Sequence, residues 1–563
     1  MAFDGFITRT IISELKNIII NAKINKVWQP NKTEIILGLY NNGKNYSLLL
    51  SSNPENCRIN LTNYSKSNPQ NAYNFCMLLR KYLVGAKIIN ISNMDLERTV
   101  EIKVEAYNEM NDLVIRKLYL QIMSRQSNII LTNHNNIIID CIKHSDSTLP
   151  AHEFEFTPIL KTSFLNITDF KNFIKILEQN NDSSIISKLT NTFIGFSVPC
   201  VTKALESLKI DQYNYTHQDL EKIYNYFKNL INNINSCNST NYSINIFNKD
   251  YTIFLEDSNK DDIKVNSFID NYYFNKEEIS TFTNYRNNLL KIILNNLKKL
   301  YKKLENINNK LNDCNNMELY KLYGELLTAN LYKVNNNTNL KEITLENYYD
   351  NYSPITIPLD SSISIQKNIE KFYKKYNKLK NTLEIVGKQK QDAIKEIDYI
   401  ESIVFSLENA TQLADILEIY DEISQNIEIK KKISINNNNN KNKKLSMQAE
   451  MNFQTFDIKG YKVYVGKNNI QNDYLSLKFA SKNDYWFHTQ TVHGSHVILK
   501  TNNETYIDDE VLYECAKLAS KYSKASNSSN TPVDYCLAKY VKKPSGSKPG
   551  KVIYNNYKTI YVK

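Results

Sequence analysis

Apolar residues recur in alternating steps of three and four along two stretches of the chain. The first seam consists of Leu290, Ile293, Leu297, Leu300, Leu304, Ile307 and Leu311, and the second of Ile365, Ile369, Phe372, Tyr376, Leu379, Leu383 and Val386 and then, after a polar Lys390, of Ala393, Ile397, Ile400, Val404 and Leu407. This heptad spacing predicts two long helices. Their outer faces are too polar for a globular bundle, so we expect an antiparallel coiled-coil hairpin whose arms each reach roughly 60 Å.

The segment between the two seams, residues 315–360, is more than a turn. "LYKLYGELLTANLYKVNNN" predicts a helix, and "NYYDNYSPITIPLD" predicts strands. We therefore expect a small folded module at the tip of the hairpin. An enzyme rarely needs such a lever, whereas a protein that must span a distance to reach a large partner does.

The parts on either side of the seams have the patterns of α+β domains. "MAFDGFITRTIISELKN" predicts an amphipathic helix, and short strands with an Asn42-Gly43 hairpin signal follow it. A helix is expected over residues 72–84, closed by Gly85, and then an antiparallel meander through "TVEIKVEAYN", "LVIRKLYLQIM" and "SNIILTNHNNIIIDCI". Residues 165–255 are more helical. Ser434–Ser446 predicts a polar linker, and residues 451–563 predict a compact α+β module with one helix near residues 509–522.

The amino-acid composition excludes some classes of protein but does not identify a function. The chain has 563 residues, is 42% hydrophobic and carries a formal net charge of +11, which permits an anionic partner without requiring one. No two of its eight cysteines form a CxxC pair, which argues against a zinc ribbon and suits a reducing compartment. The N-terminus lacks a signal-peptide pattern, and no apolar stretch reaches the roughly 18 residues of a membrane span. We expect a soluble cytoplasmic protein.

The sequence contains few candidates for catalytic, metal-binding or nucleotide-binding residues. "SGSKPGK" lacks the glycine frame of a P-loop and does not lie between a strand and a helix. His488, His493 and His496 cluster in "WFHTQTVHGSHVI", but no neighbouring cysteine or carboxylate pair completes a metal-ligand set. No GxSxG elbow is present, and a catalytic triad with widely separated members leaves no local signature. The sequence therefore predicts no catalytic residue, no metal and no cofactor.

Contact with RNA is better supported. The loop "KYVKKPSGSKPGKVIY" contains no acid. Pro544 and Pro549 keep it extended, and Gly546 and Gly550 allow backbone N–H groups to approach a phosphate closely. The predicted contacts are Lys539, Lys542, Lys543, Lys548 and Lys551 in this loop, and Lys467, Asn468, Asn469, Gln471 and Asn472 in "VGKNNIQND". Lysines that are merely solvated remain the alternative.

Several stretches, taken together, resemble one known family. They are "FDGFITRTIISELK", "INKVWQP", "NFCMLLRKYLVGAKI", "GELLTANLY", "ITIPLD", "KYNKLK", "VGKNNIQND", "DYWFHTQTVHGSHVI", "TPVDYCLAKYVKKPSG" and "KPGKVIY". In this order they are similar to the NFACT family, which comprises the RqcH and NEMF-type ribosome quality control factors and is known in bacteria as fibronectin-binding protein A-like. The resemblance extends over nearly the whole chain.

The resemblance implies a multidomain α+β fold. Residues 1–175 correspond to a glycosylase-like NFACT-N domain, 176–270 to a helix-hairpin-helix region, 271–314 and 361–432 to the coiled-coil arms, 315–360 to the middle (tip) module, 433–450 to a linker and 451–563 to the NFACT-R RNA-binding domain. "SKLTNTFIGFSVPCVTKAL" fits the helix-hairpin-helix region, with Ser197 where a second hairpin glycine is expected.

The resemblance also implies a function. Members of the family bind stalled large ribosomal subunits that carry peptidyl-tRNA, near the stalk base, and recruit tRNA, in bacteria typically tRNA-Ala. The tRNA supports mRNA-independent tailing of the nascent chain, which marks it for degradation, while the ribosome itself forms the peptide bonds. A small S4-like RNA-binding protein of the RqcP type is the further expected partner, and no membrane is expected.

Two family motifs place the predicted tRNA site. The Asp-Arg pair of the family corresponds to Glu97 and Arg98, and the "EIMGRHSN" segment corresponds to "QIMSRQSN", which supplies Gln121, Ile122, Met123 and Arg125. Glu97 is longer than aspartate by a methylene and Gln121 has lost a charge, so the identity of the tRNA and the retention of tailing are open. An exposed ion pair is the alternative for Glu97 and Arg98.

The resemblance and the fold that it implies also raise three other functions. Glycosylase activity is rejected, because the second residue is Ala2 rather than the proline nucleophile and the zinc finger is missing. A fibronectin-binding adhesin and an RNA-binding protein without tailing activity remain alternatives, with fibronectin as the partner of the former.

Overall fold

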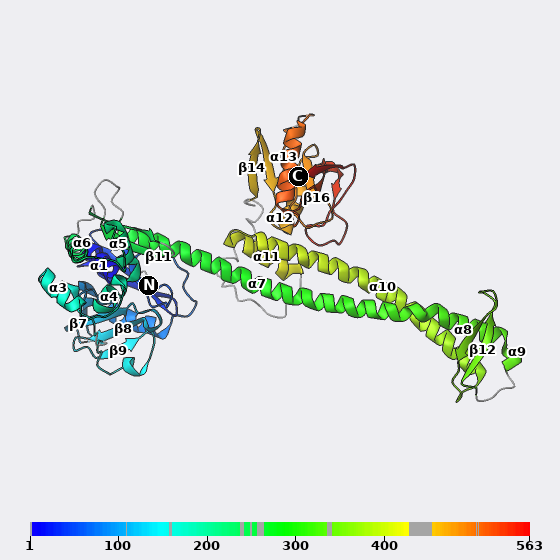
Figure 1. Cartoon of the computed structure of the whole chain (residues 1–563), viewed down its shortest axis with the longest axis horizontal. Coiled ribbons are helices and arrows are strands. Elements are labelled where there is room, and N and C mark those ends of the chain that lie inside the picture. The colour runs from blue at the N-terminus through cyan, green and yellow to red at the C-terminus, as the bar shows by residue number, and fades with distance from the viewer. Residues whose placement is uncertain are drawn as a thin grey trace. The chain divides into compact units, whose positions relative to one another are not determined.

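The computed structural model describes residues 3–563 apart from 109, 157–159, 237–240, 248–249, 256–263, 335–339, 427–452, 503 and 505. The chain forms two compact units, Met1–Glu277 and Glu278–Lys563. Figure 1 colours it from blue at the N-terminus to red at the C-terminus. The linker predicted at Ser434–Ser446 and the residue Ala2 lie outside the described residues.

The first unit is built on a fully antiparallel sheet in the order β4-β3-β2-β1-β5-β6-β7-β8-β9. Its strands are β1 (Lys23–Asn31), β2 (Glu34–Asn41), β3 (Lys44–Ser51), β4 (Arg58–Leu61), β5 (Lys87–Asn93), β6 (Thr99–Tyr107), β7 (Leu113–Gln121), β8 (Asn128–Asn133) and β9 (Ile138–Cys141). The predicted hairpin at Asn42-Gly43 is confirmed, since both residues have positive φ between β2 and β3. The meander β6-β7-β8 is confirmed as well.

Two helices, α1 (Gly5–Ile19) and α2 (Asn74–Leu83), pack against this sheet. The remaining helices pack on one another and on α1, and they are α3 (Phe170–Leu177), α4 (Ile185–Thr192), α5 (Val198–Leu208) and α6 (His217–Asn235), with the hairpin β10 (Tyr242–Phe247) and β11 (Asp250–Leu255) after them. The α1 face is amphipathic as predicted, and Phe6 packs at 5.0 Å against Phe196 and at 5.6 Å against Phe227. The helical character expected of residues 165–255 is thus found as well.

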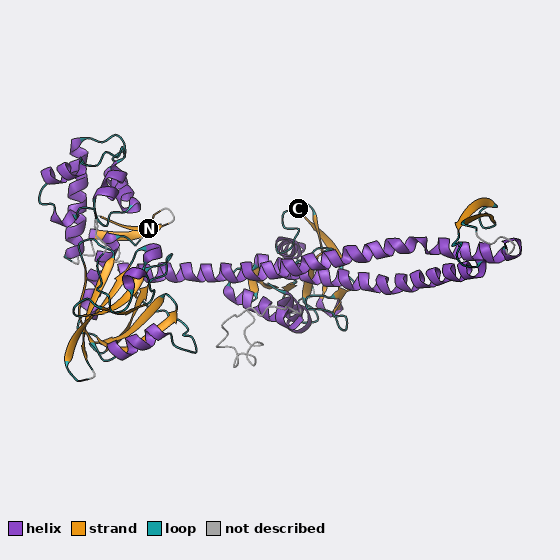
Figure 2. Cartoon of the chain, turned by 90° about the horizontal axis from the view of Figure 1, so that it is seen from below, coloured by secondary structure: helices purple, strands orange, loops and turns teal. Residues whose placement is uncertain are grey.

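The two heptad seams form long helices, α7 (Val265–Asp313) and α10 (Ile365–Asn409), followed by α11 (Leu413–Asn426). The helices lie side by side in both Figure 1 and Figure 2, and they bury Ile293, Leu300, Ile400 and Leu407 together. The prediction is wrong for Leu383, which is 42% exposed. Phe372, Val386 and Ala393, which are separated by multiples of seven residues, stay buried on either side of Leu383, whereas Tyr376 is half-buried.

The tip module is folded, as predicted. It contains α8 (Met317–Ala329), α9 (Leu331–Val334) and a hairpin of β12 (Glu342–Asn347) and β13 (Ser353–Pro358). Its small core joins Leu326, Leu327 and Ile357 to Phe372 of α10. The module is therefore anchored on the coiled coil by its own apolar contacts.

The C-terminal domain has a six-stranded antiparallel sheet in the order β14-β15-β17-β16-β18-β21. Its elements are β14 (Gln454–Ile458), β15 (Tyr461–Val465), α12 (Asn469–Tyr474), β16 (Tyr485–Thr489), β17 (Val497–Leu499), α13 (Asp509–Lys521), β18 (Thr531–Leu537), β19 (Val541–Lys542), β20 (Ile553–Tyr554) and β21 (Lys558–Val562). The helix expected near residues 509–522 is α13, which buries Val511, Cys515 and Ala519 on the sheet. Among the described residues, no helix combines the length and the apolar character needed to cross a bilayer.

Candidate nucleic-acid interface

Glu97 and Arg98 lie in the tight loop that joins β5 to β6, and both side chains are half-buried. The Glu97 N–H donates to the Met94 carbonyl at 2.8 Å, and the Asn93 side-chain amide donates to the Glu97 carbonyl at 3.0 Å. Burial raises the pKa of the Glu97 carboxyl, against the opposing charge of Arg98. The backbone therefore holds this charged pair in one fixed turn.

The loop is held in place by a close approach of three backbone segments. A Cβ atom on Gly5 would lie 2.1 Å from the Leu96 carbonyl oxygen, and one on Gly195, whose φ is +81°, would lie 2.5 Å from the same atom. The Gly5 N–H also donates to the Gly195 carbonyl at 3.1 Å. Only glycine fits at these two positions, so the start of α1 and the α4–α5 turn position the residue that precedes Glu97.

Asp4 lies buried beneath this loop. It caps α1 by accepting from the Ile7 N–H at 3.0 Å, and it accepts from the Ser197 hydroxyl at 2.5 Å. Burial raises its pKa to about 6, although its hydrogen bonds and the charge of Arg98 oppose the rise. Ser197 in turn caps α5 through the Cys200 N–H. Sequence reasoning missed Asp4 as a site residue, although an Asp-Gly pair before an amphipathic helix signals a cap.

The second predicted tRNA segment lies next to the first. Gln121 pairs with Thr99 across β6 and β7, and the Ile122 N–H donates to the Arg98 carbonyl at 3.0 Å. Gln121 and Met123 are half-buried and Arg125 is exposed. Ile122 is fully buried, which corrects its expected role, because a core side chain offers no surface to a ligand.

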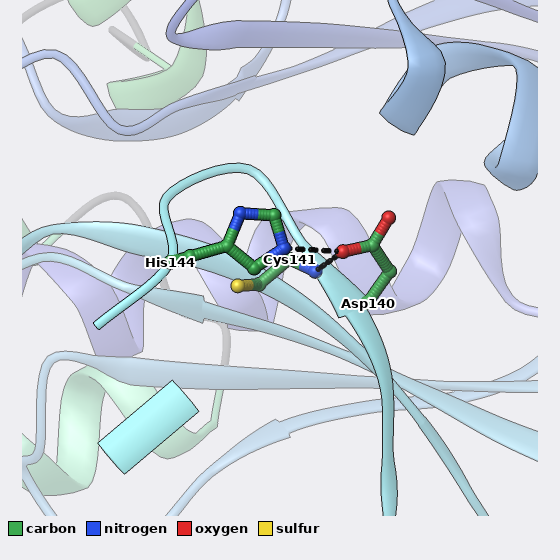
Figure 3. Close-up of side chains that lie close together, drawn as sticks. All are labelled: Asp140, Cys141 and His144. Atoms are coloured by element: carbon green, nitrogen blue, oxygen red, sulfur yellow. Dashed lines mark hydrogen bonds and ion pairs between the residues drawn. The ribbon is translucent and has the colours of Figure 1, made fainter. Parts of the chain in front are cut away.

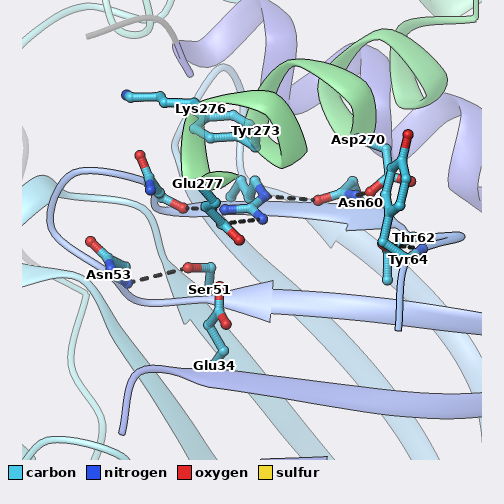
Figure 4. Close-up of polar contacts among 12 residues, drawn as sticks. Glu34, Ser51, Asn53, Asn60, Thr62, Tyr64, Asp270, Tyr273, Lys276 and Glu277 are labelled. Atoms are coloured by element: carbon cyan, nitrogen blue, oxygen red, sulfur yellow. Dashed lines mark hydrogen bonds and ion pairs between the residues drawn. The ribbon is translucent and has the colours of Figure 1, made fainter. Parts of the chain in front are cut away.

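A buried polar network ties the start of α7 to β4 at the edge of the same sheet (Figure 4). The Arg58 guanidinium pairs with Glu277 at 2.8 Å, and Lys66 pairs with Glu277 at 2.6 Å. Burial opposes ionisation of Glu277, yet the charges of Arg58 and Lys66 lower its pKa overall. Asn266 and Asp270 of α7 contact the strand directly: the Leu61 N–H donates to the Asn266 Oδ1 at 2.7 Å, and the Asn60 Nδ2 donates to the Asp270 Oδ1 at 3.0 Å. The first turns of α7 thus belong to this domain.

In the C-terminal domain, the residues at the start of α12 face α11 rather than solvent. Lys467 pairs with Asp415 at 3.1 Å, and the Asn468 and Gln471 amides both donate to Glu418 at 2.7 Å. Asn469 donates to Glu422 at 2.9 Å. Asn472 is also buried and accepts from the His496 N–H at 3.0 Å. The expectation that these side chains form an open RNA surface is wrong for this conformation.

The basic loop of residues 539–554 is partly engaged in contacts with other parts of the protein. Lys543 pairs with Asp473 of α12, and the Lys548 ammonium donates to the Asn426 carbonyl at 2.9 Å. The Gly550 N–H donates to Asp473 at 2.9 Å, and a Cβ there would lie 2.5 Å from the Asn469 side-chain oxygen. Gly550 therefore serves packing on α12, which corrects the view that it admits a phosphate. The exposed lysines are Lys539, Lys542, Lys548 and Lys551.

In this domain His496 is buried and His488 is half-buried beside it, whereas the His493 Nε2 lies 3.4 Å from the Glu401 carboxylate of α10. The rings of His488 and His496 lie 5.2 Å apart, and His496 shares a 2.7 Å hydrogen bond with the Ser476 hydroxyl. Burial lowers the pKa of His488 to about 4 and also lowers the pKa of His496 well below its ordinary value. The two rings are neutral near pH 7 and pack around Trp486.

Asp140, Cys141 and His144 form the one group of candidate metal ligands among the described residues (Figure 3). The Asp140 carboxylate lies 2.8 Å from the His144 Nε2. The Cys141 thiol faces two carbonyl acceptors, those of Lys143 at 2.9 Å and Thr148 at 3.1 Å, and burial raises its pKa. These surroundings stabilise the thiol over the thiolate that a metal binds, so the group favours a hydrogen-bonded turn.

A sheet domain, a coiled-coil hairpin and a basic C-terminal domain together define a multidomain α+β protein. Residues 4–444 match the family model described as NFACT N-terminal and middle domains, and residues 451–556 match the NFACT protein RNA binding domain. The chain therefore belongs to the NFACT family.

Full-length relatives are similar to this chain from end to end. It is 32% identical over 577 residues to Rqc2 homolog RqcH of Bacillus subtilis (strain 168), covering 100% of this chain and 98% of that protein. It is 31% identical over 571 residues to the Rqc2 homolog RqcH of Streptococcus pneumoniae (strain D39), with the same coverage. Among solved structures, the N-terminal part of the fibronectin/fibrinogen-binding protein from Streptococcus suis is 26% identical, with a TM-score of 0.40, over 48% of this chain and 99% of that one.

Proposed function

We propose that this protein acts in ribosome quality control. It binds large ribosomal subunits that still hold peptidyl-tRNA after a stall and recruits tRNA for mRNA-independent tailing of the nascent chain, which marks that chain for degradation. Full-length similarity to Rqc2 homologs and the match to an RNA binding domain support this proposal. The cytoplasm is the compartment in which this function would operate.

One observation carries the tRNA part of the proposal. The Glu97-Arg98 turn and the Gln121–Arg125 segment, separated along the chain, are joined by the hydrogen bond from the Ile122 N–H to the Arg98 carbonyl. An arginine held in a fixed turn beside an exposed loop can present its planar donors to a phosphate or base. The recruited tRNA is proposed to be tRNA-Ala, and the ribosome supplies the peptide-bond chemistry, so the protein itself is a positioning factor rather than an enzyme.

The coiled coil supplies the reach toward the ribosome. α7 has 49 residues and therefore measures about 70 Å along its axis. The folded tip module is proposed to contact rRNA and a ribosomal protein near the stalk base, and a small S4-like RNA-binding protein of the RqcP type is the further proposed partner.

Co-sedimentation with large subunits, followed by sequencing of the recovered tRNA, tests this function. We expect Arg98→Ala and Arg98→Lys to lose tRNA while they still sediment with the subunit, since lysine does not reproduce the guanidinium fork. Lys103→Ala, which removes a cation paired with Glu101 on neighbouring β6, is the matched control. Equal tRNA recovery from all variants would refute the site, and binding to immobilised fibronectin without ribosome association would favour the adhesin alternative.

A further inference from the structure

The contact between α11 and the C-terminal domain pairs one row of acids with one set of donors. Asp415, Glu418 and Glu422 are spaced by three and four residues, so they lie on one face of α11 and span about 10 Å. Across from them are an ammonium group and three carboxamides, from Lys467, Asn468, Asn469 and Gln471. Every bond in this row runs from a donor of the C-terminal domain to a carboxylate oxygen of α11.

This donor set has the chemistry of a backbone-binding surface. Lysine and carboxamide side chains are groups that contact phosphate and sugar oxygens in protein–nucleic acid complexes. Carboxylates offer the same features as phosphates, namely negative charge and acceptor oxygens only. The acids of α11 therefore occupy the surface at which the RNA backbone would be bound.

The contact between α11 and the C-terminal domain also has features of a reversible interdomain contact. The apolar core of the coiled coil around Ile416 and Ile419 and the cores of the C-terminal domain around Val511 and Trp486 are separate clusters. No buried apolar side chain of the described residues joins them, and polar interfaces between domains are typical of reversible contacts.

One buried acceptor at the centre of this contact has no hydrogen-bond partner. Glu422 is buried and accepts from Asn469 and from the Tyr399 hydroxyl at 2.9 Å through Oε1, whereas its Oε2 has no hydrogen-bond partner. A buried acceptor without a partner costs free energy in the docked state, and that cost is recovered when α11 leaves.

We propose that α11 is an intramolecular competitor of RNA: its three carboxylates occupy the α12 face of the C-terminal domain, and an RNA backbone displaces them. The inference rests on the proposed RNA-binding function and adds a regulated surface to it. In the docked state, Lys539, Lys542 and Lys551 remain exposed and attract RNA weakly. Undocking adds four donors, so RNA binding and release of α11 are coupled.

The test uses the full chain and a labelled 20-nucleotide single-stranded RNA. Glu418 is the residue to change, because it accepts two of the hydrogen bonds, whereas Asp415 also holds the N-terminal turn of α11 through the Gln412 N–H. Glu418→Lys should bind this RNA about fivefold more tightly than Glu408→Lys. Glu408 is an exposed acid of α10, so its variant has the same change of charge without the contact.

Amide hydrogen exchange in α11 provides the second measurement. In the wild type, saturating RNA should speed exchange in Leu413–Asn426 and leave α13 unchanged. Equal RNA affinities of the two lysine variants, or unchanged α11 exchange while RNA is bound, would overturn the competition and leave RNA binding itself intact. Failure of every variant to bind RNA, with α11 already exchanging fast in Glu418→Lys, would instead overturn the RNA-binding function.

Discussion

Replacing Gly195 with alanine should disturb the candidate tRNA site from a distance. The new Cβ would lie 2.5 Å from the Leu96 carbonyl oxygen and 2.6 Å from the Leu96 Cβ, and its φ of +81° is itself unfavourable for alanine. Left-handed backbone costs about 1–2 kcal/mol, and overpacking against neighbours that cannot move adds about 1–3 kcal/mol. Relief requires Leu96 to shift, and with it the Glu97-Arg98 turn.

Gly85→Ala separates these two contributions. Gly85 has a φ of +90° but nothing within 4 Å of the added Cβ, so only the backbone cost applies. We expect Gly195→Ala to lower the free energy of unfolding of the first unit by about 2 kcal/mol more than Gly85→Ala does. Urea unfolding followed by the fluorescence of Trp28, in a Trp486→Phe background that removes the other of the two tryptophans, measures this difference.

The same pair of variants tests the function of the turn. At temperatures where both proteins are folded, Gly195→Ala should recover less tRNA with the large subunit, whereas Gly85→Ala should match the wild type. Equal unfolding midpoints for the two variants would refute the close approach of Gly195 to Leu96. Normal tRNA recovery by a destabilised Gly195→Ala would separate the stability of the domain from tRNA recruitment.

Three further outcomes are expected. Deleting Asn315–Pro358 and joining the arms by a short turn should leave a folded protein that no longer sediments with large subunits; undiminished sedimentation would argue against tip docking. Changing Lys539, Lys542 and Lys551 to alanine should weaken RNA binding and flatten its salt dependence by roughly 0.7–0.9 in log-log slope per lost phosphate contact, with parallel slopes contradicting this. Burial raises the pKa of Glu422 to about 7, where Tyr399, Asn469, Asp473 and Lys543 surround it. Between the ordinary glutamate pKa of 4.5 and about 7, the docked state therefore binds more protons than the open state. Docking should strengthen as the pH falls from 8 to 6, and a comparison of α11 exchange in the wild type and in Glu422→Gln measures this effect.

Local patterns anticipated much of this fold. The heptads, the Asn42-Gly43 turn and the amphipathic first helix each follow from side-chain periodicity or from a required backbone conformation, and those signals lie within a few residues. The pairing of Thr99 with Gln121, which brings the two tRNA motifs together, also follows from a simple meander. The exposure of Leu383 could not be predicted, because a heptad pattern does not show where along a coiled coil the two helices cease to bury both of its core positions.

Local sequence patterns could not predict hydrogen-bond and ion-pair partners that are far apart along the chain. Lys543 lies in a loop without a local acid, yet its partner Asp473 is 70 residues away. The donors of "GKNNIQND" meet acids of a helix that precedes them by about 50 residues. Charge alone makes such residues equally suitable for RNA and for a neighbouring helix, so only the folded arrangement decides between the two.

The attachment of α7 to β4 has a consequence for aggregation. β4 is an outermost strand of its sheet, and such a strand offers unpaired backbone groups to any other extended chain. Here the Leu61 N–H and carbonyl are both bonded to the Asn266 side chain, and the Asn63 N–H is bonded to Asp270. A fragment that ends before Val265 would lack α7 and would expose the unpaired edge of β4. It should self-associate through added strands, while a fragment that includes the first turns of the helix should stay monomeric.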